Sequence, residues 1–387
     1  MQQFDFDNVP DRRGSSSCKW DSAPSGDVIP LWVADMDFPA APCIIDAMRK
    51  RLEHGVFGYV KVPDSFYDAL INWFDKRHSW EIDRAMVSYT IGVVPALSAV
   101  IKALTNPGDG VIIQSPVYNC FFSSVRNNGC VLIDSPLKRI ETPDGFTYKM
   151  DFEDLRRKAE SPSTRLMLLC NPHNPAGRIW TREELAEMAA ICRENGVTVI
   201  SDEIHCEFTM PGYEYTPYAT VDPHAVICCS PSKSFNIAGL QTACIISPDS
   251  KTKALIDKAI NINETCDVNP FGVVAFQAAY NEGYPWLKAL LDYIYGNYRT
   301  LRQFFASELP QLKVCDIEGT YLAWIDISPL GIKSTDLEKI ALERFGVWIN
   351  PGEMYGQEGY IRINMACPRK RLEAGLQRLK KAIESLE

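Results

Sequence analysis

The sequence lacks the features that would place it in a membrane or on a nucleic acid. No apolar run approaches the about 20 residues that a membrane-spanning helix needs. No basic run and no stripe of basic and aromatic residues is present, and the net charge is −9, from 40 basic and 49 acidic residues. We therefore expect neither a membrane nor a nucleic acid as a partner of this 387-residue chain.

Several common catalytic signatures are missing as well. Gly108-Asp109-Gly110 begins like a dinucleotide-binding loop but has no third glycine in register. The Walker A lysine, the His-Glu-x-x-His zinc motif and the Gly-x-Ser-x-Gly nucleophile elbow are absent. The five histidines have no metal-ligand spacing. We therefore expect no metal and none of the chemistries that depend on these motifs.

The cysteines form no recognisable framework. Their number, 13, is odd, their spacing is irregular, and no Cys-x-x-Cys occurs. Several lie within apolar runs, where a thiol behaves as a small hydrophobic side chain. The first residues have neither the basic nor the apolar region of a secretory signal. These features predict a protein of the reducing cytoplasm without a disulfide framework.

What the sequence does contain is a long alternation of strand-like and helix-like runs over 88–247. This pattern is typical of an α/β fold, with a mostly parallel central sheet and helices on both faces. A long helical pattern over 284–309, followed by shorter strand-like and helical runs, predicts a second, smaller α+β domain. The hydrophobic content of 46% and the length suit a folded enzyme of two domains. The strand-like runs in the first part are 111–114, 130–133, 165–170, 197–201, 225–229 and 243–247.

Three of these apolar runs end in conspicuous polar segments. Residues 171–177 read NPHNPAG, residues 201–205 read SDEIH, and residues 230–236 read SPSKSFN. Open α/β sheets bind their ligands at the carboxyl ends of the strands. A lysine among serines at such a place suits a cofactor that carries both an aldehyde and a phosphate. The amine can form a Schiff base, and the hydroxyl and backbone N–H groups can hold the phosphate.

The order of these three motifs resembles the fold-type I pyridoxal 5′-phosphate (PLP) enzymes of the class I/II aminotransferase superfamily. Three further segments resemble its cystathionine β-lyase (C–S lyase) branch, the MalY/PatB family; they are 32–38 (WVADMDF), 54–59 (HGVFGY) and 361–368 (IRINMACP). The resemblance runs from Phe4 to the C-terminus. It implies a large PLP-binding domain over 45–285 and a small domain that joins 1–44 with 286–387. Composition and periodicity alone do not predict that pairing.

The resemblance assigns roles to the residues of the three motifs. Lys233 would form the Schiff base and then act as the general base at the substrate Cα. Asp202 would keep the pyridine nitrogen protonated, and Asn174 would donate to the 3′-oxygen of the cofactor and help to bind substrate. His205 stands where aminotransferases have a tyrosine that also contacts this oxygen. A shared role and an inert, packed ring are both compatible with the sequence.

The phosphate of the cofactor is expected to bind where 91–96 begin a helix, because a free helix N-terminus is an anion site. The predicted ligands there and in the lysine segment are Gly92, Val93, Val94, Ser230 and Ser232. Aminotransferases add an arginine eight residues after the lysine, and that position is Gln241 here. The change removes one positive charge from the phosphate site and fits the lyase branch.

Four other positions complete the predicted site. Tyr118 matches the aromatic residue that stacks on the cofactor ring, and we count it with the catalytic residues. Arg362 would grip the substrate α-carboxylate with two parallel hydrogen bonds, and Ala34 is assigned to substrate binding. Tyr59 matches a tyrosine that reaches the phosphate of the neighbouring subunit. The resemblance therefore implies a homodimer with shared active sites.

The predicted function is that of a PLP-dependent carbon–sulfur β-lyase. It would cleave L-cystathionine, L-cysteine or related S-substituted cysteines to a thiol or hydrogen sulfide, pyruvate and ammonia, and the sequence does not choose among these amino-acid substrates. A class I/II aminotransferase is one alternative, against which His205 and Gln241 count. A regulatory protein that binds a transcription factor is an alternative of another class, because some members of the resembled branch have that role.

Overall fold

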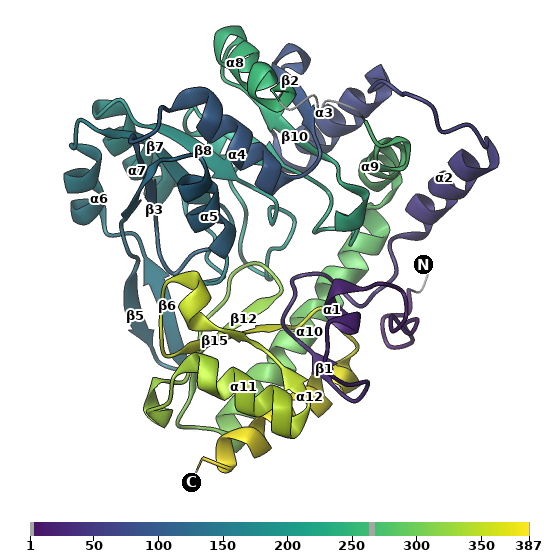
Figure 1. The fold of residues 1–387 in the computed structure, drawn as a ribbon, viewed down its shortest axis with the longest axis vertical. Coiled ribbons are helices and arrows are strands. Elements are labelled where there is room, and N and C mark those ends of the chain that lie inside the picture. The colour runs from purple at the N-terminus through teal and green to yellow at the C-terminus, as the bar shows by residue number, and fades with distance from the viewer. Residues whose placement is uncertain (1–3, 263–267, 387) are drawn as a thin grey trace.

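A seven-stranded sheet is the largest layer of the structure, a computed structural model that describes residues 4–262 and 268–386 (Figure 1). From edge to edge its strands are β2 (Val87–Thr90), β10 (Ala243–Ile246), β9 (Val226–Cys229), β8 (Thr198–Asp202), β7 (Thr164–Cys170), β3 (Gly110–Ile113) and β4 (Val131–Asp134). β10 is antiparallel to both of its neighbours, and the other neighbouring pairs are parallel. Every residue of β3, β9 and β10 is buried, as parallel sheets between helices require. The predicted α/β fold with a mostly parallel sheet is confirmed.

Alternate residues of the central strands pack into two separate hydrophobic clusters, one on each face of the sheet. In β7, Leu166 and Leu168 pack in the cluster formed with α4 and α5, whereas Met167 and Leu169 pack in the cluster that includes α7. Because successive side chains of a strand point to opposite faces of the sheet, both faces are apolar and both are covered by helices. The helices around the sheet are α4 (Val93–Leu104), α5 (Asn119–Asn127), α6 (Phe152–Ala159), α7 (Arg182–Glu194) and α8 (Ser250–Asn261).

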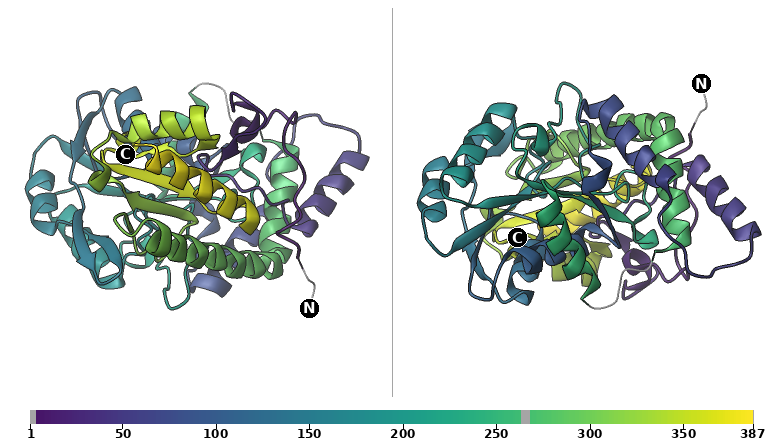
Figure 2. Two further views of the ribbon diagram at one scale, coloured as in Figure 1. Left: turned by 90° about the horizontal axis from the view of Figure 1, so that it is seen from below. Right: turned by 90° about the horizontal axis from the view of Figure 1, so that it is seen from above.

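A second, smaller sheet lies below the first in Figure 1. It has four antiparallel strands in the order β11 (Lys313–Val314), β12 (Leu322–Asp326), β15 (Tyr360–Asn364) and β14 (Asn350–Pro351). Three helices lie side by side on its outer face (Figure 2), namely α10 (Tyr284–Glu308), α12 (Arg369–Glu384) and α11 (Ser334–Phe345). The long helix and the strand–helix pattern expected after position 284 are both present.

The N-terminal segment joins the C-terminal part of the chain. After α1 (Cys18–Asp21), the short strand β1 (Ile29–Pro30) pairs in parallel with β13 (Val347–Trp348). The chain then continues to α2 (Pro42–Glu53) and α3 (Asp64–His78), which pack against α9 (Pro270–Glu282). This pairing agrees with the combination of early and late residues that the resemblance implies; the domain boundaries themselves stay a prediction.

Some elements were not anticipated from the sequence. The strand-like runs did not include β2, which has only four residues. The hairpin of β5 (Lys138–Thr142) and β6 (Gly145–Lys149) was also missed. The sequence of β5, KRIET, is mostly charged and partly exposed, so it does not show the alternation of a strand with one buried face. The hairpin reaches the small sheet, where Phe146 pairs with Cys315.

Two findings bear on the expected environment of the protein. No helix in the described ranges has the length and apolar character that crossing a membrane would take. The cysteines of the described residues are free thiols, and most of them are buried. Cys170, Cys228 and Cys244 pack in the hydrophobic clusters of the large sheet, as small apolar side chains would.

Candidate active site

A cavity of about 280 Å³ lies at the C-terminal ends of β7 and β8, beside the loop that follows β9. It brings together most of the residues singled out from the sequence, although these are spread over more than 300 positions. The predicted residues that line it are Ala34, Gly92, Val93, Val94, Tyr118, Asn174, Asp202, His205, Ser232, Lys233 and Arg362. Ser230 and Tyr59 are the predicted residues that do not line it.

Lys233 points its amine into this cavity from the loop after β9. Its Nζ donates a hydrogen bond to the Ala34 carbonyl oxygen at 2.6 Å. Burial, followed by the positive charge of Arg362, lowers the pKa of Lys233 from 10.5 to about 8, although Asp35 and Asp202 oppose the change. A fraction of this lysine is therefore neutral near physiological pH, and a neutral amine can act as a nucleophile or a base.

Asp202 is the last residue of β8 and is 3% exposed. One carboxylate oxygen accepts a hydrogen bond from the backbone N–H of Ile204 at 3.1 Å. Burial raises the pKa of Asp202 to about 7, against the lowering effect of that hydrogen bond and of Lys233. A cationic partner near this carboxyl group would lower its pKa again, because the partner would stabilise the charged form.

Arg362 lines the cavity from β15. Its Nη1 donates to the side-chain oxygen of Asn174 at 3.2 Å, and its Nη2 donates to the carbonyl oxygen of Trp32 at 3.0 Å. The guanidinium lies 4.8 Å from the centre of the Tyr355 ring. The Nε of Arg362 is buried, and the part of the chain that the structure describes offers it no hydrogen-bond partner. A guanidinium that is oriented on two sides and still has a free donor is well placed to bind a carboxylate.

The end of the cavity near α4 provides donors for an anion. Helix α4 begins at Val93, so its first backbone N–H groups face this end, as expected. Ser230 lies behind the cavity: its hydroxyl donates to the Thr242 carbonyl oxygen at 2.7 Å and accepts from the Ser232 N–H at 3.0 Å. Ser230 thus shapes the loop, and its predicted contact with phosphate stays a prediction.

Sequence reasoning missed Thr242 and Tyr321. Thr242 lines the cavity next to Gln241, and its buried hydroxyl has no hydrogen-bond partner among the described residues. Tyr321 donates its hydroxyl to the Ala34 carbonyl oxygen at 2.9 Å. No motif marks either residue in the sequence. For Thr242, the one available signal is its place beside Gln241, where the family arginine is missing.

The two aromatic candidates differ in their surroundings. His205 is 3% exposed, and its Nδ1 has no hydrogen-bond partner in the described ranges. Burial together with the charges of Lys233 and Arg362 holds the pKa of His205 well below 6.5. The ring is therefore neutral. Tyr118, at the start of α5, lines the cavity, and burial raises its pKa well above 10. Its predicted stacking on a cofactor ring stays a prediction.

Tyr59 is almost fully exposed to solvent, with 96% of its surface accessible. It belongs to residues 55–63, which connect α2 to α3 without regular secondary structure; we call them the extended segment. Val56 and Phe57 of this segment are also exposed. Within one chain Tyr59 does not line the cavity, and its predicted service to another subunit stays a prediction.

The loop after β8 is anchored by two buried glutamates. Glu203 accepts hydrogen bonds from Ser201 and from the Tyr218 N–H, at 2.8 and 2.9 Å. Glu207 binds Trp73, Arg77 and His78 of α3. His78, Cys206 and Glu207 lie close enough to hold a cation. Both carboxylate oxygens of Glu207 are nevertheless occupied by these donors, and the Arg77 charge would repel a cation. We therefore assign the group to loop anchoring.

Three comparisons place the chain among known proteins. Residues 26–379 match the family described as aminotransferase class I and II. The sequence is 40% identical to cystathionine beta-lyase PatB of Bacillus subtilis (strain 168) over 390 residues, which cover 98% of this chain and 100% of that protein. The fold matches cystalysin from Treponema denticola, which contains a pyridoxal 5′-phosphate cofactor, with a TM-score of 0.95 and 32% identity over 100% of both chains. It also matches the PLP-bound C–S lyase from Staphylococcus hominis, with a TM-score of 0.90 and 34% identity, covering 98% of this chain and 99% of that one.

Proposed function

Because the chain belongs to the aminotransferase class I and II family, we propose that it is a PLP-dependent carbon–sulfur β-lyase. The observation that carries the proposal is the meeting of three groups in one cavity: the amine of Lys233, the carboxyl of Asp202 and the guanidinium of Arg362. The full-length relatives confirm the sequence-based predictions of the MalY/PatB branch, of the PLP cofactor and of a carbon–sulfur lyase.

The donors and charges of the cavity fit PLP. The buried Thr242 hydroxyl has no hydrogen-bond partner within residues 4–262 and 268–386, and it would hold the phosphate together with Ser232 and the start of α4. Asp202 would bind the pyridine nitrogen, and Asn174 would donate to the ring oxygen. The bound cofactor supplies an electron sink for the negative charge that develops at the substrate Cα.

The side chains of the cavity would divide the remaining work. Arg362 would bind the α-carboxylate of the amino acid and fix its orientation. The amine of Lys233, whose pKa is lowered to about 8, would accept the Cα proton near neutral pH. Asp202 would keep a positive charge at the pyridine nitrogen. Loss of the Cβ substituent as a thiol, followed by hydrolysis with one water, would leave pyruvate and ammonia.

The proposal includes a homodimer in which Tyr59 binds the phosphate of the partner's cofactor. Its support is the exposure of the extended segment, in which Val56 is 63% and Tyr59 is 96% exposed. A groove of about 640 Å³ between α2 and α9 lies next to that segment and has room for part of a second copy. The hydroxyl of the partner's Tyr59 would donate to the phosphate in place of the arginine that aminotransferases have at the position of Gln241.

We also propose the division into a large domain over 45–285 and a small domain over 1–44 and 286–387. The pairing of β1 with β13 supports it. A reducing compartment, the cytoplasm, is proposed because the many buried thiols of the described chain are free.

A product assay tests the function directly. The purified protein with PLP would receive L-cystathionine or L-cysteine, with no keto acid present. Pyruvate and ammonia should form in equal amounts, together with homocysteine or sulfide. A cofactor-loaded protein that releases no pyruvate from any S-substituted cysteine would contradict the proposal.

Aminotransferase activity is the second candidate, because the matching family contains this chemistry. The same cavity would bind the amino acid, but a keto acid would then be required as the acceptor. Adding pyruvate or 2-oxoglutarate to the assay separates the two functions: a transaminase would consume the keto acid, whereas a lyase would produce pyruvate without it. Binding of a transcription factor remains a prediction that a pull-down with an inactive variant would test.

A further inference from the structure

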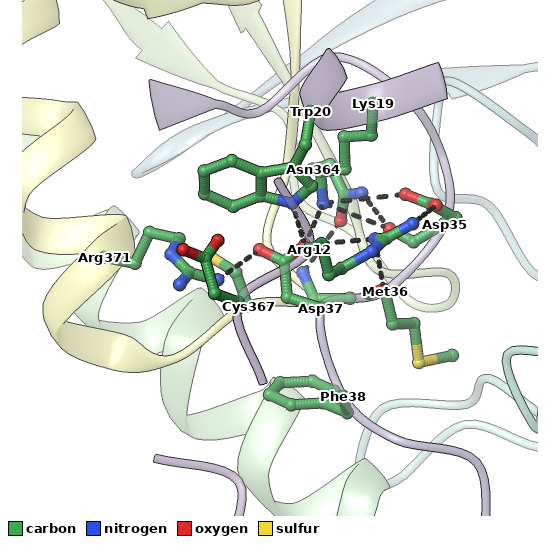
Figure 3. A network of polar contacts seen from close by, with 12 residues as sticks. Arg12, Lys19, Trp20, Asp35, Met36, Asp37, Phe38, Asn364, Cys367 and Arg371 are labelled. Atoms are coloured by element: carbon green, nitrogen blue, oxygen red, sulfur yellow. Dashed lines mark hydrogen bonds and ion pairs between the residues drawn. The ribbon is translucent and has the colours of Figure 1, made fainter. Parts of the chain in front are cut away.

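A buried ion network lies behind one wall of the cavity (Figure 3). The wall consists of residues 31–38, which we call the wall segment, and its Val33 and Ala34 line the cavity. We propose that the network is a positioning element: it fixes the Ala34 carbonyl and thereby holds the Lys233 amine where it can act on the substrate. This inference rests on the proposed function. The ion network consists of Arg12, Lys19, Asp35, Asp37 and Arg371.

Asp37 lies at the centre of the network. Its side chain has no exposed surface, and its oxygens lie 3.1 Å from Nζ of Lys19 and 2.7 Å from Nη1 of Arg371. Trp20 donates its indole N–H to Asp37 at 3.0 Å. Burial alone would raise the pKa of Asp37, but the charges of Lys19 and Arg371 hold it below its usual value. Figure 3 shows these side chains converging on Asp37.

Asp35 extends the network towards the cavity. Its carboxylate lies 2.6 Å from Nη2 of Arg12 and 3.7 Å from Nζ of Lys19. Lys19 also has no exposed side-chain surface, and it donates to the backbone oxygen of Asp35 at 3.3 Å. Asn364 donates to the same backbone oxygen at 2.6 Å. Asn364 also donates to the backbone oxygen of Val33, so the peptide groups before and after the one that contains the Ala34 carbonyl are held by residues from distant parts of the chain.

The wall segment is also tied to the loop that carries Lys233. Asn236, three residues after the lysine, donates to the backbone oxygens of Met36 and Phe38 at 3.0 and 2.8 Å, and it accepts from the N–H of Met36 at 3.0 Å. The wall and the lysine loop therefore have a fixed mutual position. Buried ion pairs add little net stability, because their charges lose water, and setting a unique geometry is their best-attested use.

The Ala34 carbonyl transmits this geometry to the amine. It accepts one hydrogen bond from Lys233 and another from the hydroxyl of Tyr321. A base must sit within a narrow range of distances from the proton that it removes, and a displacement of about 1 Å can lower a rate about 100-fold. A wall that shifts when its ion network is broken would therefore slow proton transfer without removing any group that contacts the substrate.

Exchange of the α-proton of L-alanine for deuterium tests the inference. L-Alanine has no leaving group at Cβ, so no elimination follows proton transfer. NMR can therefore monitor exchange of its α-proton in D₂O by the PLP-loaded protein as a measure of proton transfer without elimination. Lys19→Met should lower the maximal exchange rate at least about tenfold, while the L-alanine concentration at half-maximal rate changes little. Lys380→Met is the matched control, because Lys380 forms an exposed ion pair with Glu308 at 2.7 Å. It should exchange at the wild-type rate.

Tyr321→Phe provides a second variant that leaves every charge of the network in place. It removes one hydrogen bond from the Ala34 carbonyl and should slow exchange in the same direction. If Lys19→Met and Tyr321→Phe exchange as fast as the wild type, even with a lower free energy of unfolding, the network is merely structural and the inference is overturned. If the wild-type protein itself binds PLP and does not exchange the proton, the proposed function and this inference fail together.

Discussion

The wall segment and the extended segment are close in sequence and opposite in character. Residues 31–38 are bound on both sides, by the buried ion network and by Asn236, and they hold the lysine amine. Residues 55–63 have no regular structure, and Tyr59 is 96% exposed. The amine of Lys233 and the guanidinium of Arg362 thus meet within one chain, whereas the proposed role of the extended segment lies in a second copy of the chain. Substitutions in the parts of the site that one chain completes and in the extended segment should therefore change activity and cofactor binding to different extents, and they should affect different subunits.

Removing the Lys233 amine is expected to have the largest effect on the part of the site that one chain completes. Lys233→Ala should abolish pyruvate formation and prevent borohydride from attaching the cofactor to the protein. Mass spectrometry of the reduced protein locates the attachment. Lys313→Ala, which changes a lysine on the surface, is the control and should behave as the wild type. A cofactor attached to another lysine in the wild-type protein would refute the assignment.

Asp202→Asn keeps the shape of the side chain and removes its charge. Turnover should fall roughly 100- to 1000-fold, the range seen when one electrostatic contact to a developing charge is lost. The free energy of unfolding of the cofactor-free protein should not decrease. Burial raises the pKa of Asp202, so its negative charge opposes folding, and asparagine carries no charge. Steady-state kinetics and urea denaturation measure the two quantities, and near-normal turnover would contradict the role of Asp202.

Lys233→Met separates the amine's function from its effect on stability. In the cofactor-free protein the pKa of Lys233 is about 8, below its ordinary 10.5. Below pH 8 the folded and unfolded states both hold the proton, and the buried charge opposes folding by as much as roughly 3 kcal/mol. Between pH 8 and 10.5 the unfolded state binds more protons, so wild-type stability rises with pH. The Lys233→Met protein should therefore be more stable than the wild type at pH 7, and this difference should disappear towards pH 10.5. Urea denaturation at several pH values measures the difference. A difference that does not change with pH would contradict this account.

Arg362→Lys tests the predicted binding of the substrate carboxylate. A point charge cannot form two parallel hydrogen bonds, and a charge-assisted hydrogen bond contributes about 1.5–3 kcal/mol. The KM for cystathionine should rise at least about tenfold, while the visible absorbance of the bound cofactor stays unchanged. An unaltered KM would show that the carboxylate binds elsewhere.

Tyr59→Phe has the smallest expected effect and the most specific pattern. The loss of one hydroxyl should weaken cofactor binding about tenfold, measured by fluorescence titration of the cofactor-free protein. Mixed dimers of Tyr59→Phe and Lys233→Ala chains sharpen the comparison. If Tyr59 serves the other subunit, one site carries both changes and the other site is intact. If Tyr59 serves its own subunit, each site carries one change, and no site has wild-type cofactor affinity.

The sequence predicted the elements and side chains that local patterns reveal. Asp202 ends an apolar strand, and Asn174 and Lys233 lie in the polar segments that follow two others, so the rule of strand ends placed them at one edge of the sheet. Thr242 was missed because a threonine after a turn carries no pattern of its own. The hydrogen bond from the Ser230 hydroxyl to the Thr242 carbonyl was not expected from the motif, and the contact of Ser230 with phosphate stays a prediction.

The ion network illustrates what local patterns cannot reveal. Lys19 and Asp37 are 18 positions apart, and Arg371 lies more than 300 positions further along the chain. In the sequence each of them resembles an ordinary surface charge. Their meeting depends on the pairing of the N-terminal segment with the C-terminal elements, of which β1 and β13 are one part. The long-range topology, and not any residue type, creates the network.

The hydrogen bond between Arg362 and Asn174 has a consequence for how the site ages. The side-chain oxygen of Asn174 accepts from the arginine, so its NH₂ group is left for the cofactor. Deamidation to aspartate would replace this donor with a negative charge. Deamidation of asparagine ordinarily begins with attack by the backbone nitrogen of the next residue, but that residue is Pro175, whose nitrogen carries no hydrogen. The neighbouring Asn171 is likewise followed by Pro172. The prolines therefore make these two amides durable, and the protein should retain them over its lifetime in the cell.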